Sequence, residues 1–326
     1  MIITRTPLRI SIGGGGTDLP SYYRRRGGHF ISAAVNRYIY IAINDTFTDD
    51  YLIKYSSMER AQQVEEIEHP LVREALRLHP IGHAKEIVSI ADIPAGTGLG
   101  SSGAFTVGLL RALHAYQRHH VNAGTLAEEA CHIEIDILGE PVGKQDQYIA
   151  AYGGLTRFEV STEGAVTASA LGVSTSTLRD LEERLLLFFT GYSRRAGEVL
   201  ADQNKRSNEG DEAMLARLAE TETIGRRIGE ALEAGDMAAY GGLMHEHWLA
   251  KRDRSPHMSN SDIDHWYQLG IDNGALGGKL VGAGAGGFLM FYAKDADRLR
   301  EAMAGAQLTE VRFSFDHDGS TVTVRD

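Results

Sequence analysis

The chain has 326 residues, of which 43% are hydrophobic and 24% are charged, and its formal net charge is −11. This composition is typical of a globular enzyme of about two domains, and the acidic charge argues against a protein that binds nucleic acid or an anionic membrane. No uncharged apolar run reaches the roughly 18 residues that span a bilayer, so we expect a cytoplasmic protein.

Strand-like segments dominate the first part of the chain. ITRTPLRISIG is expected to be the first strand and is followed by the glycine run 13–16, and residues 27–44 and 50–56 are rich in Ile, Tyr and Val. Residues 58–80 are expected to be mostly helical. The strand EIVSIADI then leads through PAGTGLGSSGAF (94–105) into a helix over 103–119, where apolar residues recur near a 3.6-residue period.

Two further elements follow this helix. TLAEEACHIEIDILG is expected to be a second helix, with Thr125 and Glu128 at the spacing of a capping box. It contains the single cysteine, Cys131, which we expect to be a buried thiol rather than a reactive one. GGLTRFEV (153–160) is expected to be a strand.

The composition of the sequence changes after the polar segment 161–178. RLLLFFTG is expected to be an apolar strand, and long helices are expected from about 194 to 250. Further on, SPHMSNSDIDHWYQLG leads into a helix, GKLVGAGAGGFLMFY predicts strand–loop–strand, DADRLREAMAGA predicts a helix, and the tail predicts a hairpin around Asp318 and Gly319. Strands and helices mix without a regular βαβ repeat, which favours an α+β fold of two domains, 1–175 and 176–326.

The glycine-rich segment 94–105 predicts an anion site, because it joins a strand to a helix. GLGSSG within it matches G-x-G-x-x-G, but a dinucleotide fold needs a second strand after the helix, and another helix follows instead. Ala104 occupies the lysine position of a Walker A loop. What remains is a loop whose N–H groups attract phosphate, with the hydroxyls of Ser101 and Ser102 beside them; a serine-capped turn without a ligand is the alternative.

A phosphate loop without a lysine implies a metal ion, and Mg²⁺ prefers carboxylate ligands. The nearby carboxylates are Glu134 and Asp136 in the second helix and Asp146 in GEPVGKQDQYIAAYGG. A solvated helix face is the alternative for the first two. Asp146 is unusual, because it lies between two glutamines and close to Lys144 in a turn-like segment.

Three segments together resemble the GHMP small-molecule kinases. They are TPLRISIGGGGTDLP (6–20), PAGTGLGSSGA (94–104) and GGKLVGAGAGGFLMFY (277–292), and the resemblance spans essentially the whole chain. It implies an N-terminal domain like the second domain of ribosomal protein S5 and a ferredoxin-like C-terminal domain. ATP and a small substrate would meet in the cleft between them.

The resemblance also implies roles for individual residues. Asp146 matches the family's catalytic aspartate, and Arg9 matches the basic residue that pairs with it in galactokinase-like members. Asp18 matches the aspartate that binds sugar hydroxyls in those members. Ser102 and Glu134 would hold Mg²⁺. The ATP phosphates would lie against Gly96, Gly98, Gly100, Ser101, Ser102 and Gly103, and further substrate contacts would come from Gly16, Thr17 and Gly284.

Within the family, GGGTDLPSYY, GKQDQY and SPHMSN most resemble the D-glycero-D-manno-heptose 7-phosphate kinases. Those enzymes phosphorylate the anomeric C1 hydroxyl to give the 1,7-bisphosphate, which feeds nucleotide-activated heptose for lipopolysaccharide, capsule or surface-layer glycans. A fucokinase- or galactokinase-like enzyme of an unphosphorylated sugar is one alternative, and a non-catalytic ligand-binding homologue is another.

A substrate that carries a phosphate requires a cationic pocket on this acidic protein. Lys144 is the first candidate, because it lies two residues before Asp146, although a structural ion pair is its alternative role. The other candidates are Lys251, Arg252, Arg254, Arg24, Arg25 and Arg26. GYSRRAGEVL (191–200) could line the cleft or cap a helix. His245 and His247 lack the spacing of a metalloprotease motif.

Overall fold

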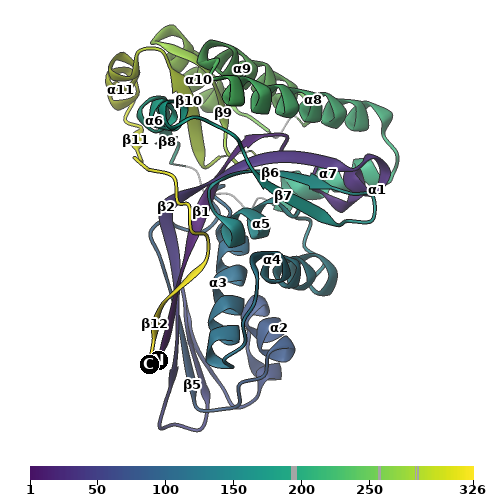
Figure 1. The fold of residues 1–326 in the computed structure, drawn as a ribbon, viewed down its shortest axis with the longest axis vertical. Coiled ribbons are helices and arrows are strands. Elements are labelled where there is room, and N and C mark those ends of the chain that lie inside the picture. Colours follow the sequence, from purple (N-terminus) through teal and green to yellow (C-terminus); the bar gives the residue numbers. More distant parts are fainter. Residues whose placement is uncertain (192–196, 256–257, 283, 285) are drawn as a thin grey trace.

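The computed structural model describes residues 1–326 except 192–196, 256–257, 283 and 285, and it describes residues 197–200 by their backbone only. Two sheets, each covered by helices, form the lower and upper parts of the molecule in Figure 1. The mixture of strands and helices without a βαβ repeat is the α+β architecture that the sequence predicts.

The first sheet is organised around one long strand, β2. The first half of β2 pairs with β6, and its second half pairs with β5. The path through the sheet is β12-β1-β2-β5-β3-β4, with β6 attached to β2 and β7 attached to β6, and among the described strands of this sheet only the β3–β5 pairing is parallel. The strands are β1 (Ile2–Gly13), β2 (Gly28–Asp45), β3 (Tyr51–Lys54), β4 (Met58–Ala61), β5 (Lys85–Ala91), β6 (Leu155–Val160), β7 (Val166–Ala170) and β12 (Thr321–Arg325).

Helices of the first half of the chain lie against one face of this sheet (Figure 1). Alternate residues of β1 and β2 that face these helices are apolar and buried, so the face becomes the main core. The helices on this side are α2 (Pro70–Leu78), α3 (Ser101–Tyr116), α4 (Ala123–Cys131) and α5 (Gln145–Tyr152), and α4 runs directly into a π-helical turn, His132–Ile137; α1 (Pro20–Arg26) lies apart from them, in the connection between β1 and β2. This packing directs the start of α3 and the start of α5 toward the upper part of the molecule.

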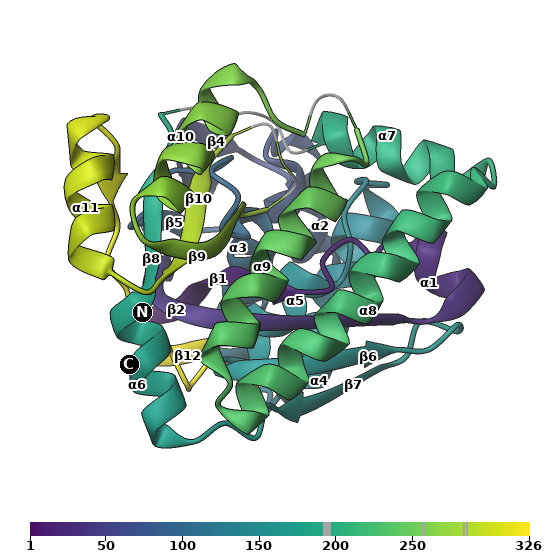
Figure 2. The same cartoon turned by 90° about the horizontal axis from the view of Figure 1, so that it is seen from above.

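The second sheet is antiparallel, in the order β11-β8-β10-β9. In Figure 2, α8 and α9 lie side by side; α8 packs on β1 and β2 and α9 packs on β9, so the two helices connect the two parts of the molecule. The strands are β8 (Leu185–Phe189), β9 (Ala275–Leu280), β10 (Phe288–Ala293) and β11 (Thr309–Glu310), and the helices are α6 (Thr175–Arg184), α7 (Gly197–Asn208), α8 (Glu212–Ala234), α9 (Met237–Arg252), α10 (Ser261–Asp272) and α11 (Ala296–Gly305).

The end of the chain returns to the first sheet. β12 pairs with β1, and the amino group of Met1 lies 3.4 Å from a carboxylate oxygen of Asp326, so the two termini meet (Figure 1). The predicted hairpin around Asp318 is therefore wrong, because the segment before it bridges β2 through Phe315 and Val35, whereas the segment after it, β12, pairs with β1. The last strand of the segment 176–326, β12, thus lies in the first sheet.

Two local predictions also differ from the structure. The stretch that begins at Met58 is strand β4, not helix, because its backbone pairs with β3 at the edge of the sheet. The predicted capping box at Thr125 is wrong as well: the helix begins at Ala123, and the side chain of Asn122 accepts a hydrogen bond from the N–H of Thr125. Cys131 is buried, as expected.

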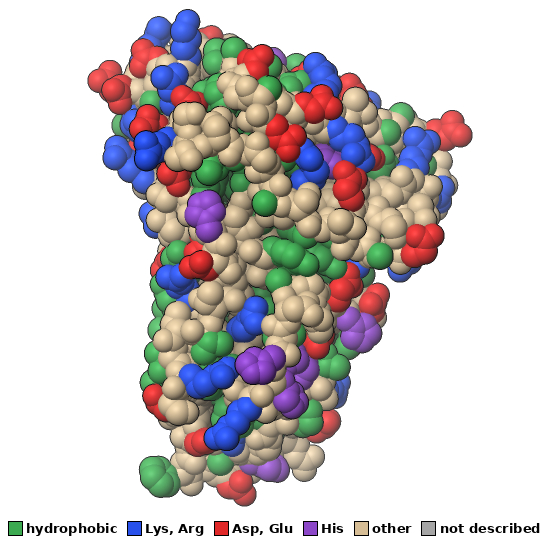
Figure 3. Space-filling model, viewed as in Figure 1, with side chains coloured by type: hydrophobic (Ala, Val, Ile, Leu, Met, Phe, Trp, Pro, Cys, Tyr) green, Lys and Arg blue, Asp and Glu red, His purple; other side chains and the backbone are tan. Residues whose placement is uncertain are grey.

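Surface properties add little that distinguishes the molecule. On the face shown in Figure 3, acidic and basic side chains are interspersed, and histidines gather over the region of α2 and α3. None of the helices that the structure describes combines the length and the apolar character needed to cross a bilayer.

Candidate active site

A cleft of about 690 Å³ lies where the two parts of the molecule meet. Its walls come from the glycine loop before α3, the loop between β1 and α1, the start of α5, and the facing segments of α9 and β9. A cleft of this size accommodates an organic ligand of several hundred daltons.

The two glycine-rich loops that the sequence singles out pack against each other at this cleft. A Cβ added to Gly98 would lie 2.6 Å from the carbonyl oxygen of Val281, and one added to Gly282 would lie 2.6 Å from the Cα of Gly98. Gly98 has φ +89° and Gly282 has φ +82°, so both also hold a backbone conformation that favours glycine. The loops therefore form one continuous wall of backbone.

The start of α3 points into the cleft. Gly100 is the N-cap residue in the left-handed conformation, and the helix begins at Ser101. Gly96, Gly98, Gly100, Ser101 and Ser102 all line the cleft. The Oγ of Ser101 is buried and has no hydrogen-bond partner among the described residues. Free N–H groups, a positive helix end and an unused hydroxyl form a site for an anion such as phosphate.

Asp146 and Arg9 form an ion pair in the cleft. The Nε and Nη2 atoms of Arg9 each lie 2.7 Å from the Oδ1 of Asp146, and Nη1 donates to the carbonyl of Gly98. No hydrogen bond to the other carboxylate oxygen, Oδ2, occurs among the described residues. A Cβ on Gly103 would lie 2.7 Å from the Cβ of Asp146, so the start of α3 is pressed against the aspartate. The pair thus lies beside the anion site with one carboxylate oxygen unused.

Asp18 lies close to Asp146, next to the start of α5. Its carboxylate is buried and accepts hydrogen bonds from the N–H groups of Gly16 (2.9 Å) and Gln145 (3.1 Å). Burial raises its pKa, and the neighbouring carboxylate of Asp146 adds to this effect. Gly16 also lines the cleft. Thr17 does not: its hydroxyl lies 2.8 Å from the carbonyl oxygens of Gly14 and His29, and it holds the loop in shape.

Glu134 is the buried carboxylate nearest to the start of α3. It is 1% exposed, and burial raises its pKa to about 7, although hydrogen bonds from Gln147 and Ser102 act in the opposite direction. No ion pair to a basic side chain occurs at Glu134 among the described residues. A buried oxygen ligand without a cation, next to a serine hydroxyl, fits the ligand set of a magnesium ion.

Four basic side chains line the other wall of the cleft and are almost fully buried. His247, Lys251 and Arg254 lie along α9 and just after its end, and Lys279 comes from β9. Sequence reasoning selected Lys251 and Arg254 but missed His247 and Lys279. His247 and Lys251 are four residues apart and so lie on one face of α9, which leads to Arg254; this spacing could have been used as a signal.

Three predicted contacts lie elsewhere, and each is a correction. Lys144 does not line the cleft: its Nζ is held by both carboxylate oxygens of Glu128 and by the carbonyl of Gly164, which is the structural ion pair. Arg252 pairs with Asp264 at the surface. Gly284 is not among the cleft residues and packs on Met258.

The other candidate residues named from the sequence, Arg24, Arg25, Arg26 and Asp136, do not line the cleft either. Arg24, Arg25 and Arg26 are exposed, and Asp136 pairs with His132 at the surface. Residues 192–196 of the segment 191–200, and Pro256 and His257 of the SPHMSN motif, lie outside the described residues.

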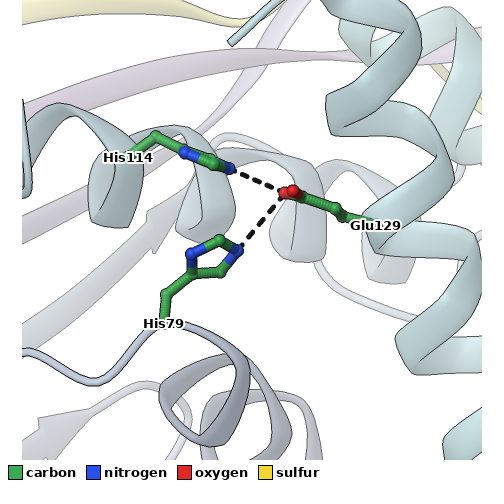
Figure 4. Close-up of side chains that lie close together, drawn as sticks. All are labelled: His79, His114 and Glu129. Atoms are coloured by element: carbon green, nitrogen blue, oxygen red, sulfur yellow. Dashed lines mark hydrogen bonds and ion pairs between the residues drawn. The ribbon is translucent and has the colours of Figure 1, made fainter. Parts of the chain in front are cut away.

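A separate cluster joins His79, His114 and Glu129, outside the residues that line the cleft (Figure 4). One carboxylate oxygen of Glu129 lies 2.7 Å from Nε2 of His114 and 3.3 Å from Nε2 of His79. The three ligand atoms are close enough to hold a metal ion. However, the Nδ1 of His114 is buried without a partner among the described residues, whereas a metal-bound imidazole normally donates its second N–H. We therefore interpret the cluster as a hydrogen-bonded ion pair.

This cluster gives a testable pH dependence of stability. Burial alone would raise the pKa of Glu129, but hydrogen bonds from His114 and His79 lower it to about 2. A carboxyl with a lowered pKa stabilises the fold above its unfolded pKa of about 4.5 and loses this effect as the pH falls toward 2. We expect Glu129→Gln to reduce the free energy of unfolding by about 1–2 kcal/mol at pH 7, a figure reduced for partial exposure. Urea unfolding should show this difference shrinking as the pH falls from about 5.5 to 3.5; a constant difference would contradict the ion-pair role.

Two family models match the chain. The GHMP kinases N terminal domain matches residues 67–154, and the GHMP kinases C terminal model matches residues 229–308. Together they cover 168 of 326 residues, which is more than half of the chain. The first match contains the glycine loop and Asp146, and the second contains the basic wall of the cleft and the second glycine loop.

Similar proteins extend this match to the full length. The D-glycero-alpha-D-manno-heptose 7-phosphate kinase of Campylobacter jejuni is 30% identical over 98% of this chain and 97% of its own. The bifunctional fucokinase/GDP-fucose pyrophosphorylase of Arabidopsis thaliana is 26% identical over 90% of this chain, which spans 30% of that relative. A D-glycero-D-manno-heptose 1-phosphate kinase of Bacteroides thetaiotaomicron has the same fold, with a TM-score of 0.81 over 100% of both chains at 22% identity.

Proposed function

The chain belongs to the GHMP kinase family, and from this premise we propose that it transfers the γ-phosphoryl group of ATP to the anomeric C1 hydroxyl of D-glycero-D-manno-heptose 7-phosphate. Members of the family are ATP-dependent phosphotransferases, so the proposal concerns the acceptor and the roles of the residues. The observation that carries it is the Arg9–Asp146 pair, which contacts the glycine loop before α3 and lies close to the buried Asp18.

We propose that Asp146 accepts the proton of the acceptor hydroxyl. In the transfer, the acceptor oxygen forms a bond to the γ-phosphorus while the bond to the β,γ-bridging oxygen breaks and ADP leaves. Oδ2 of Asp146 is unused and can accept the hydroxyl proton, which later passes to solvent. Arg9 holds Asp146 through Oδ1 and adds positive charge where negative charge spreads over the transferring group.

We propose that Ser102 and Glu134 would hold Mg²⁺. The fit rests on the chemistry of the donor set: a buried carboxylate without a basic partner among the described residues, next to a hydroxyl. When bound, the ion would neutralise negative charge on the ATP phosphates. The glycine loop has no lysine that could do this. The N–H groups at the start of α3 and the Oγ of Ser101 would orient those phosphates.

The adenine ring fits the far end of the cleft, which is largely apolar. There the ring of His69 stacks on Phe105 at 4.9 Å, and the ring of Tyr55 meets His69 edge-on at 4.6 Å. Ile93 and Leu71 complete this part of the lining. A planar heteroaromatic base can stack on such a surface, and this leaves the Asp146 end for the sugar.

A specific observation supports a phosphorylated acceptor over a neutral one. The sugar end of the cleft carries both Asp18, suited to hydroxyl groups, and buried basic side chains, suited to an anion. The relative of 30% identity is named as a heptose 7-phosphate kinase. The similarity to a fucokinase supports the second candidate function, an anomeric kinase of a neutral sugar.

A substrate panel tests this function. Purified protein with ATP and Mg²⁺ is offered anomer-defined heptose 7-phosphate, mannose 6-phosphate, free heptose, fucose and galactose, and ADP release is measured. We expect kcat/KM for heptose 7-phosphate to exceed that for free heptose by at least about 30-fold, since binding a phosphate in a buried charged site contributes 2 kcal/mol or more. The product should show phosphorus at C1 by ³¹P NMR. Turnover of unphosphorylated sugars alone would overturn the choice of acceptor.

A further inference from the structure

The basic wall of the cleft is unusual for its burial. His247, Lys251, Arg254 and Lys279 are exposed by only 2%, 7%, 3% and 2%, although basic side chains are rarely buried unless they are paired. His247 and Lys251 are four residues apart on α9 and therefore lie on the same face. All four side chains line the cleft rather than the interior of a domain.

Among the residues that the structure describes, no ion pair explains the burial of these side chains. Lys251 donates to the carbonyls of Leu280 and Gly282, and Lys279 donates to the carbonyl of Ile12 at 2.9 Å. Among the described residues, no carboxylate lies within ion-pair distance of Lys251, Arg254 or Lys279. Backbone carbonyls are neutral acceptors, so the charges of the two lysines are not balanced by these contacts, and Arg254 is attracted only by the more distant carboxylates of Asp18 and Glu220.

Unused donors point in the same direction. Both ring nitrogens of His247 and the Nε of Arg254 are buried without a hydrogen-bond partner among the described residues. Burial, followed by repulsion from Arg254 and Arg9, lowers the pKa of Lys279 to about 7. A group of cations that disfavours its own charged state is costly to maintain, and a bound anion would remove this cost.

We propose that Lys251, Arg254, Lys279 and His247 form a binding site for a phosphate monoester, and that its occupant is the phosphate that the sugar acceptor already carries. This assignment rests on the proposed function, which it deepens by naming the residues that select a phosphorylated sugar. A sugar phosphate is close to a dianion at neutral pH, so it would neutralise most of the charge of the site.

The neighbours of the site favour the acceptor over ATP as the source of the phosphate. Arg254 donates to the carbonyl of Gly15, and Lys279 donates to the carbonyl of Ile12. Both contacts are with the segment that leads to Asp18, the residue suited to sugar hydroxyls. The apolar end of the cleft, with Tyr55 and His69, comes from other elements. ATP phosphates remain the other source of the same chemistry, because Arg9 is close enough to influence both lysines.

Binding to the resting protein tests the site without catalysis. The wild type and Lys279→Met are saturated with a non-hydrolysable ATP analogue, so that the glycine loop is filled, and inorganic phosphate is titrated at constant ionic strength. We expect phosphate to raise the melting temperature of the wild type but not of Lys279→Met. Without phosphate, the variant should melt at or above the wild-type temperature, because an unpaired buried ammonium is replaced by an apolar chain of similar length. A variant that melts lower yet still responds to phosphate would overturn the proposal, since Lys279 would then be structural.

Kinetics distinguish the two sources of phosphate. In Lys251→Met and Lys279→Met we expect KM for the sugar phosphate to rise at least about 30-fold, the loss seen when one partner of a buried charge pair is removed. KM for ATP and for any neutral sugar should change little. The exposed Lys294→Met is the matched control and should behave as the wild type. A comparable rise in KM for ATP, or no change for either substrate, would overturn the proposal.

The outcome also separates this site from the proposed function. If the substrate panel shows no turnover of the heptose phosphate but phosphate still protects the wild type and not Lys279→Met, the phosphate site stands and the choice of sugar falls. If turnover of the heptose phosphate is found and the variants keep its KM, the function stands and the site falls.

Discussion

Asp146→Asn is expected to lower kcat by about 10²- to 10⁴-fold, the range for loss of a positioned proton acceptor. Asparagine has the size of aspartate and can still meet Arg9, but its amide cannot take the proton of the acceptor hydroxyl. It also removes the charge that holds the guanidinium in place at 2.7 Å. The effect should appear in kcat rather than in KM, because the lost interaction is made with the reacting group. Steady-state assays with saturating ATP would measure it.

The control for this variant is Asp136→Asn. Asp136 lies ten residues earlier, its side chain is 56% exposed, and its partner is His132 at the surface. This variant should keep the wild-type kcat. Circular dichroism and the melting temperature of Asp146→Asn should show a folded protein, since the replaced side chain is of the same size. A folded Asp146→Asn variant with full activity would exclude the proposed role of Asp146.

Sequence patterns predicted those elements whose local signals agree with their final environment. The first strand, β2, β5 with its glycine loop, and the strand–loop–strand of β9 and β10 all occur near their predicted positions. The family, the fold class and the kinase activity are confirmed by the comparisons. The strands are apolar-rich runs beside glycine-rich segments, and the family rests on three motifs in order; a sequence displays both directly.

Errors occur where distant backbone decides the local structure. Met58–Ala61 has the composition of a helix but pairs with β3 at the edge of the sheet, and tertiary context overrides such a weak propensity. The tail forms no hairpin, because β12 completes the sheet beside β1, more than 300 residues earlier. A hairpin pattern carries no information about a partner at that distance.

The residues of the candidate site also fall into those that the sequence predicts and those that only the fold reveals. The glycine loop, Asp146, Arg9 and Asp18 are in motifs, and the structure brings them together. Lys144 was the first choice for the substrate phosphate because it is near Asp146 in the chain, yet the first turn of α5 directs it to Glu128 on α4. Lys279 was missed because a single lysine in a strand has no pattern. Only the fold shows that it faces the cleft.

The wall formed by the two glycine loops carries the second large prediction, that Gly98→Ala weakens both ATP binding and the fold. The added Cβ would lie 2.6 Å from the carbonyl oxygen of Val281, and φ +89° is unfavourable for alanine. Strain of this kind costs about 1–3 kcal/mol. Each 1.4 kcal/mol of strain that opposes nucleotide binding raises KM for ATP about tenfold. The carbonyl of Gly98 also accepts a hydrogen bond from Nη1 of Arg9, so a shift of the loop should lower kcat as well.

Gly242→Ala is the matched control, because no atom lies within 4 Å of the added Cβ. Alanine is the better helix former there, so this variant should be as stable as the wild type or more stable, with unchanged kinetics. Gly282→Ala should reproduce the effect of Gly98→Ala, since its Cβ would lie 2.6 Å from the Cα of Gly98.

The double variant Gly98→Ala/Gly282→Ala decides whether the two loops act as one wall. Once one added methyl group has pushed the loops apart, the second meets less resistance, so the double variant should lose less stability than the two single variants together. Melting curves and KM for ATP of all four proteins give this comparison. Strict additivity would mean that each glycine is needed only for its own backbone conformation, and that the contact between the loops has no energetic consequence.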